Sequence, residues 1–440
     1  MNKASPLVGA PLAPTMFRLA VPGVIGALLF STPGLIEASF LRASGADALA
    51  AVALVYPLII LAAMFSAGAI GGAVSGLTAR AVGAGDYQEA SSVLVCAVVI
   101  SLFGGVLMWL LVVQFGPLLY QYASDSESVI HAAQRYASFV FPAITAYWLL
   151  NMLCSVLRGS GDMVRPAVVA AVILLSYIVF ALLLIPGHEA SLDDAMQGAA
   201  FAMVGSFLVA LLLSIYFISQ AKQPVRFQLS SFRSNTAVRI LKQGLLAASQ
   251  SVMTITYALV TTVLFSRFGT DWLAGFGLAV RLELIMVPVI FGIGSSLIAI
   301  VGAYVGAGQR ERAIQIAWRG ILINAAVVGV IGLLLTMFPG VWCGVVGSDV
   351  TVIEHCSQSL RVIAPTYAFF ALGLGGYFAS QALNTLKFPV IGALFRLLIV
   401  ATGLNWVTAA TSVTAVLLLV ASAVVVYGVF VVFALKYRSW

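Results

Sequence analysis

Twelve apolar runs of about 20 residues, separated by short polar stretches, constrain this chain more than any other feature. A helix of that length crosses the hydrocarbon core of a bilayer, so each run predicts one membrane span. Hydrophobic residues make up 62% of the 440 residues and charged residues only 8%, against roughly 25% charged in soluble domains. This composition excludes a soluble or nucleic-acid-binding protein despite the net charge of +7, and it predicts an all-α integral membrane protein. The expected span cores are residues 17–40, 52–77, 93–116, 137–157, 166–186, 198–219, 243–266, 274–303, 317–339, 361–383, 388–408 and 411–435.

Positive charge is divided unequally between the two sides of the predicted membrane. Sixteen cations fall on one side, namely Lys3, Arg18, Arg80, Arg158, Arg165, Lys222, Arg226, Arg233, Arg239, Lys242, Arg310, Arg312, Arg319, Lys387, Lys436 and Arg438. Only four fall on the other side, namely Arg42, Arg135, Arg267 and Arg361. Because cytoplasmic loops carry the excess of Lys and Arg, we expect both termini in the cytoplasm and the protein in a bacterial inner membrane.

An internal repeat with an offset of 223 residues divides the chain into two halves. Pro142 matches Pro365, and Gly83-Ala84-Gly85 matches Gly306-Ala307-Gly308, where the glycines are expected to permit tight turns. Six spans in each half give the halves the same orientation, so an axis along the membrane normal should relate them, with a cavity between them. The predicted parts are a cytoplasmic tail (1–15), an N-lobe of six spans (16–220), a cytoplasmic linker (221–242) and a C-lobe of six spans (243–440).

The first span contains a single carboxylate, Glu37. Pro22 and Pro33 fall on the same helical stripe as Glu37, and each proline is an expected bend point. An acid in the middle of a bilayer costs about 2.5–3.5 kcal/mol, so it marks an ion or proton pathway by default. The alternative is that Glu37 lies in the headgroup region, paired with Arg42, without a functional role.

The rest of the chain carries no enzyme signature. The histidines His131, His188 and His355 are expected in external loops, without a nucleophile or metal ligands around them. The segment 159–162, Gly-Ser-Gly-Asp, lacks the Gly-Lys-Ser/Thr ending of a phosphate-binding loop, so uphill transport would need an ion gradient and no cofactor is expected. Cys343 and Cys356 flank one external loop, and two free thiols are favoured over a disulfide there.

Several motifs resemble those of the multidrug and toxic compound extrusion (MATE) family. They are LAAVALVYP (49–57), the Gly-Ala-Gly turn before a charged stretch in both halves, LRGSGDMVRP (157–166), AVRLELIMVPVIFGIGSSL (279–297) and VGAYVGAGQRERA (301–313). The resemblance implies a twelve-helix exporter whose two bundles form a V and exchange H⁺ or Na⁺ for organic, often cationic, small molecules. It also implies ion coupling at the helix-1 acid, here Glu37, and bending of that helix at Pro22.

One departure from the family concerns the surroundings of Glu37. Several relatives have an Asn and an Asp in the fifth span, where this chain has Ser176 and Phe180. Since the second acid is missing, we expect neutral oxygens of Tyr147, Asn151 and Ser176 to complete the site. One carboxylate with few neutral ligands favours H⁺ as the coupling ion, with Na⁺ as the alternative.

A polar stripe in the second half predicts a further site. Gln250, Thr254 and Tyr257 recur at i, i+4 and i+7, so they share one helix face and are expected to face the cavity. Polar packing between helices explains the same stripe almost equally well. Tyr257 and Tyr367 are candidates for stacking on flat organic cations.

Charged residues inside the spans of the second half add a second prediction. Arg281 and Glu283 lie roughly 200° apart around their helix, so they do not face each other, and we expect Glu283 to pair with Arg396. A flippase for lipid-linked sugars would need a more basic cavity than these two arginines provide. An exporter dedicated to one metabolite or siderophore stays open, whereas a passive channel lacks its pore loop or charge rings. The expected partners are small organic substrates, H⁺ or Na⁺ and the bilayer, and the protein is expected to be a monomer.

Overall fold

The computed structural model of the chain describes residues 7–185, 191–220, 225–347, 349–408 and 410–439. One helical bundle contains α1 (Leu12–Leu41), α2 (Ala46–Ala63), α3 (Gly71–Gly83), α4 (Tyr87–Ala123), α5 (Glu127–Val140), α6 (Ile144–Gly159), α7 (Val164–Leu184) and α8 (Leu192–Ser219). The other contains α9 (Ser234–Ser266), α10 (Thr270–Gly306), α11 (Arg310–Met337), α12 (Gly340–Val346), α13 (Val350–Ile363), α14 (Tyr367–Leu383), α15 (Lys387–Trp406) and α16 (Val413–Ala434). A π-helical segment, Met64–Ile70, joins α2 to α3.

The described helices confirm the predicted membrane spans. Eleven helical stretches in these ranges are long and apolar enough to cross a bilayer, and α5 and α6 together make a twelfth that bends by 52°. The bend contains Pro142, whose ring cannot continue a regular helix. The chain is an all-helical, multi-pass membrane protein.

Several helices extend beyond the apolar cores that predicted them. His131 lies in α5 and His355 in α13, so their expected placement in loops is wrong, while His188 falls outside the described residues. α9 begins at Ser234, inside the segment predicted to be the linker 221–242. In each case the helix starts with an amphipathic turn, which a search for apolar runs does not detect.

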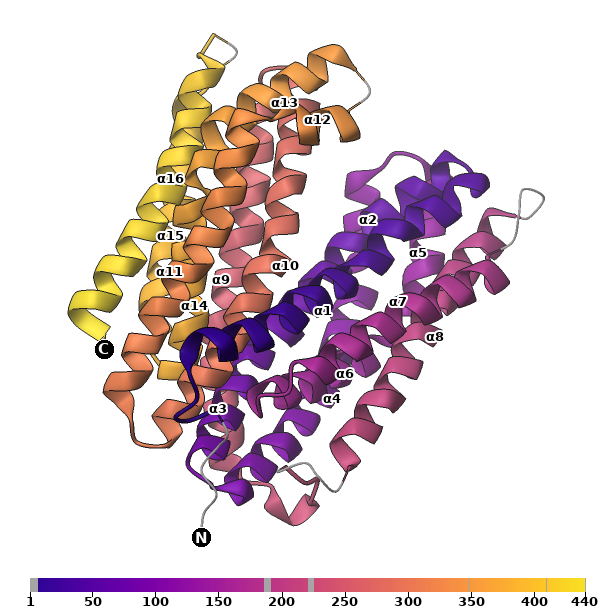
Figure 1. Cartoon of the computed structure of the whole chain (residues 1–440). Helices are drawn as coiled ribbons and strands as arrows, with labels where there is room; N and C mark the ends of the chain where they lie inside the picture. The colour runs from indigo at the N-terminus through magenta and orange to yellow at the C-terminus, as the bar shows by residue number, and fades with distance from the viewer. Residues whose placement is uncertain (1–6, 186–190, 221–224, 348, 409, 440) are drawn as a thin grey trace.

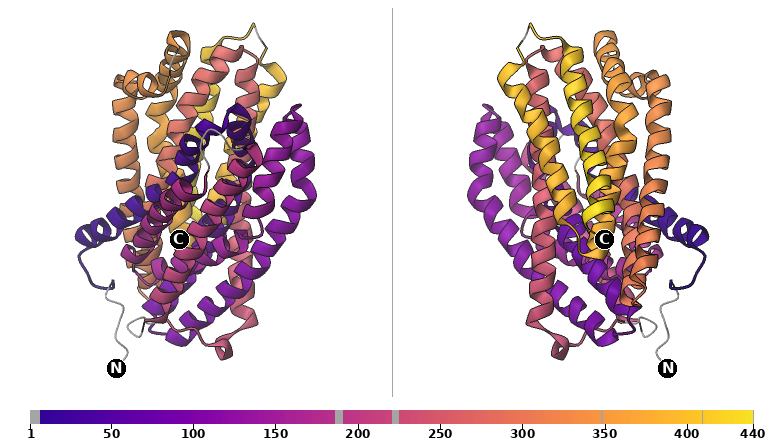
Figure 2. Two further views of the ribbon diagram at one scale, coloured as in Figure 1. Left: turned by 90° about the vertical axis from the view of Figure 1, so that its right-hand side faces the viewer. Right: turned by 90° about the vertical axis from the view of Figure 1, so that its left-hand side faces the viewer.

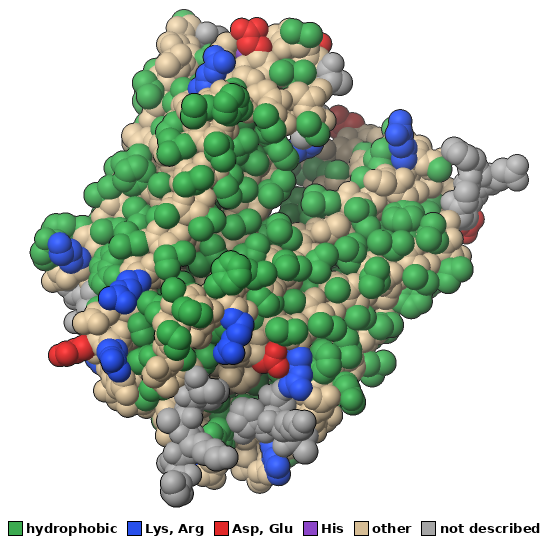
Figure 3. Space-filling model, in the orientation of Figure 1, with side chains coloured by type: hydrophobic (Ala, Val, Ile, Leu, Met, Phe, Trp, Pro, Cys, Tyr) green, Lys and Arg blue, Asp and Glu red, His purple; other side chains and the backbone are tan. Residues whose placement is uncertain are grey.

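The two bundles form a V (Figure 1). They meet near the N-terminus of the chain, here called the joined end, and diverge towards α12 and α13, here called the open end. The space-filling view shows a notch between them at the open end (Figure 3). In the side views, the helices of both bundles run roughly from the joined end to the open end (Figure 2). α1 of the first bundle packs against α10 of the second bundle. Each bundle has its own apolar core.

Small residues bring the bundles into backbone contact at the joined end. Gly306 of α10 lies against the Arg80 carbonyl of α3, and Gly83 of α3 lies against Ala303 of α10, without room for a Cβ atom at either glycine. The turns that follow these helices contain Gly85 and Gly308 at φ +71° and +75°. These angles favour glycine, so the predicted role of the repeated Gly-Ala-Gly turn is confirmed.

A disulfide connects Cys343 of α12 to Cys356 of α13, with 6.0 Å between their Cα atoms. The expectation of two free thiols at these positions is wrong. The short α12 folds back onto α13, which brings the two cysteines within bonding distance. Cys96 and Cys154 are free and buried.

Candidate functional site

Glu37 of α1 is completely buried inside the first bundle. The hydroxyl of Tyr136 on α5 donates a hydrogen bond of 2.7 Å to its Oε1 atom. The other carboxylate oxygen, Oε2, has no hydrogen-bond partner among the residues that the structure describes. Glu37 is therefore shielded from solvent, and among the described residues it makes no ion pair with the exposed Arg42, so the alternative of a Glu37–Arg42 pair is wrong.

Two more tyrosines surround the same carboxylate. Tyr177 of α7 faces Glu37 without a well-formed hydrogen bond, and Tyr56 of α2 lies near it. Tyr56 approaches α1 closely because position 34, one turn before Glu37, is a glycine. A phenol can donate to a carboxylate or accept from a carboxylic acid, so this tyrosine cluster can accommodate both forms of Glu37.

The predicted neutral ligands of Glu37 make their hydrogen bonds elsewhere. The Ser176 hydroxyl donates to carbonyls of its own helix, and the Asn151 amide donates to the Ser66 hydroxyl at 2.9 Å. The Tyr147 ring packs against Phe30, with 5.8 Å between ring centroids. In the described part of the chain, none of the three predicted residues contacts Glu37 by a hydrogen bond, so the structure does not bring them together with the carboxylate.

Pro22 and Pro33 both lie inside α1, as the sequence predicts. α1 runs without interruption through Pro22 and Pro33. Pro33 and Glu37 are both buried and Pro22 is half-buried, so the predicted stripe faces the protein interior. Bending of α1 at these prolines stays a prediction.

The expected ion pair of the second bundle is present. Arg396 of α15 lies 3.4 Å from Glu283 of α10, measured from Nη2 to Oε1, and both side chains are largely buried. The Arg396 guanidinium also stacks on the Tyr257 ring at 3.7 Å and lies 5.2 Å from the Phe370 ring centroid. The sequence predicted the pair because both charges needed a partner, and it predicted Tyr257 as a residue of the same site, but it did not predict that the Arg396 guanidinium stacks on aromatic rings.

A cavity of about 60 Å³ adjoins this ion pair. Its polar lining includes the predicted residues Thr254, Tyr257, Glu283, Tyr367 and Arg396. At roughly 10–15 Å³ for each water centre it has room for a few waters, whereas pockets for organic ligands usually measure about 300–1,000 Å³. In this conformation the cavity therefore suits water or a small ion.

Two predicted residues of the second bundle lie apart from this cavity lining. The Gln250 amide donates to the Tyr427 hydroxyl at 3.0 Å, which is a packing contact between α9 and α16. Arg281 is exposed on α10 and is not among the residues that line the cavity. Tyr427, which was not predicted, also lies 5.9 Å from the Arg396 guanidinium.

Comparison with known families identifies the architecture. The MatE family model matches residues 22–183 and again residues 247–407. The chain belongs to the MATE family. The two matched stretches confirm the repeat found in the sequence, and the predicted resemblance is correct. The protein is a MATE-family transporter of small molecules, and this family is not enzymatic.

Curated MATE relatives carry different names. A protein of Shewanella oneidensis named "FAD transporter" is 24% identical over 397 residues, which cover 89% of this chain and 86% of the relative. The "Probable multidrug resistance protein NorM" of Thermotoga maritima is 21% identical and covers 81% and 77%. The "Probable multidrug resistance protein YoeA" of Bacillus subtilis is 23% identical and covers 80% and 77%.

Solved MATE structures share the whole fold. A crystal structure of a MATE protein in the bent conformation matches with a TM-score of 0.90 at 21% identity, over 99% of this chain and 98% of the other. A protein of Pyrococcus furiosus described as a MOP superfamily transporter matches with a TM-score of 0.88, also at 21% identity and with the same coverage. At this identity the likeness shows the fold alone.

Proposed function

We propose that this MATE transporter exports organic, often cationic, small molecules in exchange for H⁺, by alternating access between its two bundles. The observation that supports this most directly is Glu37, an acid buried completely inside the membrane-spanning part of the first bundle. An intramembrane acid of this kind is rare unless it serves ion movement.

The energetics of Glu37 support a coupling role. The ionised carboxylate has one hydrogen-bond donor within the described residues, at Oε1, and its Oε2 atom has none. Burying a charge with so little compensation is unfavourable by several kcal/mol, and uptake of a positive ion removes that penalty. The free energy of the site therefore changes when a cation binds or leaves, which is what coupling requires.

The partners of Glu37 favour H⁺ over Na⁺. Tyr136 donates its hydroxyl to Glu37 and Tyr177 faces the same carboxylate, and a phenol can donate to a carboxylate or accept from a carboxylic acid. Na⁺ needs several oxygen atoms converging on one point, and the predicted ligands Asn151 and Ser176 bond elsewhere. Na⁺ remains the alternative coupling ion, and the experiment below separates the two.

The orientation of the protein follows from its charge distribution. We propose that the joined end, which carries the cation-rich connections, faces the cytoplasm of a bacterial cell and that both termini lie there. The proposed transport lobes are residues 16–220 and 243–440. α9, the first helix of the second lobe by sequence, begins before this boundary at Ser234.

The test of this function uses Glu37→Gln in proteoliposomes under an imposed pH gradient or Na⁺ gradient. Glutamine keeps the shape and can still accept the hydrogen bond from Tyr136, but it cannot bind and release a proton. We expect the folded variant to lose uphill export of a tested organic cation, and the wild type to respond to the pH gradient. Glu127→Gln, which neutralises an exposed acid at the start of α5, should export normally. Uphill export by Glu37→Gln at the wild-type rate would refute the proposal.

A second candidate is an exporter dedicated to one endogenous metabolite. One relative with high coverage is named an FAD transporter, while others are named multidrug resistance proteins. We propose to include flavin nucleotides beside organic cations in the proteoliposome panel. Export of a single compound class, with no protection of cells against toxic cations, would favour the dedicated exporter.

A further inference from the structure

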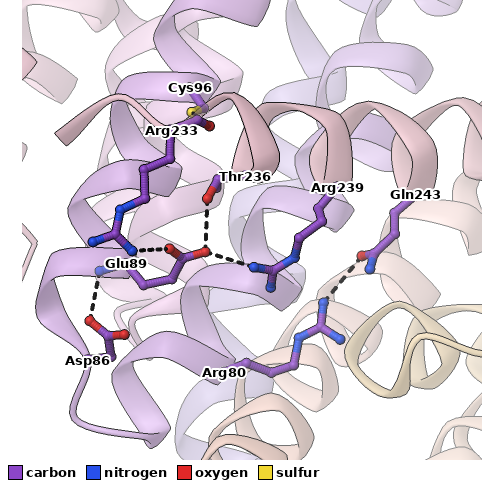
Figure 4. A network of polar contacts seen from close by, with 8 residues as sticks. All are labelled: Arg80, Asp86, Glu89, Cys96, Arg233, Thr236, Arg239 and Gln243. Atoms are coloured by element: carbon purple, nitrogen blue, oxygen red, sulfur yellow. Dashed lines mark hydrogen bonds and ion pairs between the residues drawn. The ribbon is translucent and has the colours of Figure 1, made fainter.

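A charged network connects α4 to the beginning of α9 at the joined end (Figure 4). Glu89, in the first turn of α4, accepts at Oε2 from Arg233 Nη1 at 3.2 Å. At Oε1 it accepts from Arg239 Nη1 and from the Thr236 hydroxyl, each at 3.0 Å. One carboxylate thus binds three groups of the segment that leads into the second half of the chain.

The burial of Glu89 makes this network stronger than an ordinary surface ion pair. The Glu89 side chain is 15% exposed, and those of Arg233 and Arg239 are 44% and 46% exposed. Isolated exposed pairs contribute little, whereas a mostly buried carboxylate shared by two guanidinium groups is costly to neutralise. Arg80 lies close to Arg239, so without Glu89 three cations would remain together.

A separate chain of hydrogen bonds between the two bundles lies beside this network. Arg80 Nη2 donates to Gln243 Oε1 at 3.3 Å, and Gln243 Nε2 donates to Asn384 Oδ1 at 2.9 Å. Asn384 lies in the turn between α14 and α15, in the left-handed conformation at φ +62°. Polar contacts therefore extend from α3 and α4 of the first bundle through α9 to α14 of the second.

The internal repeat relates the junction between α4 and α9 to the junction between α11 and α1. The residues of the charged network are present only at the first of these two junctions. At an offset of 223 residues, the position of Glu89 is occupied by Arg312. The stretch that matches the start of α9 in the first half of the chain, residues 7–17, contains no Lys or Arg. The junction between the start of α1 and the start of α11 therefore has a cation in place of the acid and no Lys or Arg in residues 7–17, so the ionic contact is not a consequence of the fold symmetry.

We propose that Glu89 is the centre of a one-sided ionic lock, formed with Arg233, Thr236 and Arg239, that holds the joined end closed. The bundles must separate at this end in one half of an alternating-access cycle, and α9 must then move away from α4. The lock opposes that separation and sets how often the joined end opens. This inference rests on the proposed alternating access, but it is tested without transport.

Cys96 provides a native reporter for the lock. Its thiol is buried under the start of α9 and lies 3.4 Å from the Arg233 carbonyl oxygen. A thiol reagent can reach it only after α9 separates from α4 at this point. Cys343 and Cys356 are bonded to each other, so replacing Cys154 leaves Cys96 as the single free thiol of the chain.

The experiment measures the rate at which N-ethylmaleimide labels Cys96 in the full-length Cys154→Ala protein, reconstituted in liposomes without substrate or gradient. We expect slow labelling with Glu89 intact and roughly tenfold faster labelling in Glu89→Gln, because a neutral amide holds the two arginines far less well. High salt should accelerate labelling of the wild type and not of the variant. Glu311→Gln, which removes an exposed acid from the first turn of α11, should label at the wild-type rate.

A double variant with exchanged charges distinguishes loss of the ion pair from unfolding of the protein. The double variant Glu89→Arg with Arg239→Glu should label several-fold more slowly than Glu89→Arg alone. Unchanged labelling in Glu89→Gln, equal acceleration in Glu311→Gln, or no recovery in the double variant would each overturn the lock. Labelling of Cys96 does not depend on Glu37. A result that overturns the lock is therefore distinguishable from a result that refutes proton coupling at Glu37.

Discussion

The environment of Glu37 shows that a shift of one residue along α7 determines which side chain faces the carboxylate. Ser176 and Tyr177 are neighbours in sequence, but successive residues point about 100° apart on a helix. The buried face of α7 contains Ile173, Tyr177 and Ala181, four residues apart, and therefore directs Tyr177 towards Glu37. Ser176 lies outside this face and hydrogen-bonds to its own backbone.

Removing the hydroxyl of Tyr136 should impair coupling. Tyr136→Phe leaves ionised Glu37 without its hydrogen-bond donor. Such a bond to a charged group contributes about 1.5–3 kcal/mol, so we expect coupled export to slow by roughly 10- to 150-fold. Ser176→Ala, which removes a hydroxyl one residue from Tyr177, should transport normally. Equal rates for the two variants in proteoliposomes would contradict the assignment of Tyr136.

The ion pair between Glu283 and Arg396 makes a second prediction at this scale. Breaking a buried pair leaves one charge uncompensated and destabilises a protein by about 3–5 kcal/mol, so Glu283→Gln should lower the thermal unfolding midpoint clearly. If the pair is structural, the exchange Glu283→Arg with Arg396→Glu should restore the export lost in either single reversal. Persistent loss in the double variant would instead indicate that Glu283 contacts the substrate or a cation.

At the scale of elements, several helices are longer than the hydrophobic runs that predict them. α5 places Val129, Ala132, Tyr136 and Val140 on one buried face, although it begins with exposed polar residues. A search for continuous apolar segments starts this span at residue 137 and so misses Tyr136. The helical period of the buried residues is the signal that would have found it.

The disulfide at the open end should stabilise α12 against α13. The bonded cysteines are separated by 13 residues, and closing a loop of about 15 residues contributes roughly 3 kcal/mol in the chain-entropy model. We expect Cys343→Ala with Cys356→Ala to increase amide hydrogen exchange in α12 while leaving α14 unchanged. Dithiothreitol should reproduce this increase in the wild type and have no effect on the variant. Equal exchange in oxidised and reduced wild type would contradict the prediction.

At the scale of the whole molecule, the V depends on close contact between backbones. Gly83 and Gly306 let α3 and α10 approach at the joined end, where the polar network centred on Glu89 adds charge to the contact. Away from this contact, the apolar residues of each bundle pack mostly against residues of the same bundle. A seam of small residues with a few polar contacts can separate and re-form, which suits two bundles that must rock against each other.

A larger side chain in this seam should open the joined end. In Gly306→Val the added atoms would meet the Arg80 carbonyl, and we expect a longer distance between spin labels at the exposed positions Gln88 and Glu311. Gly277→Val places the same side chain elsewhere on α10, where a Cβ atom meets nothing within 4 Å, and should leave the distance unchanged. An unaltered distance distribution in Gly306→Val would show that the seam does not control this end.

The sequence by itself determined the membrane class, the twelve spans, the two matched halves and the pair of charges at Glu283 and Arg396. These features follow from hydrophobic length, from the repeat and from the cost of an unpaired charge in a bilayer, which are properties of the chain. Tertiary structure alone decided that tyrosines surround Glu37, that Cys343 bonds to Cys356 and that Glu89 connects α4 to α9. Each of these contacts joins residues from different helices, and their meeting depends on how the helices rotate and pack against one another.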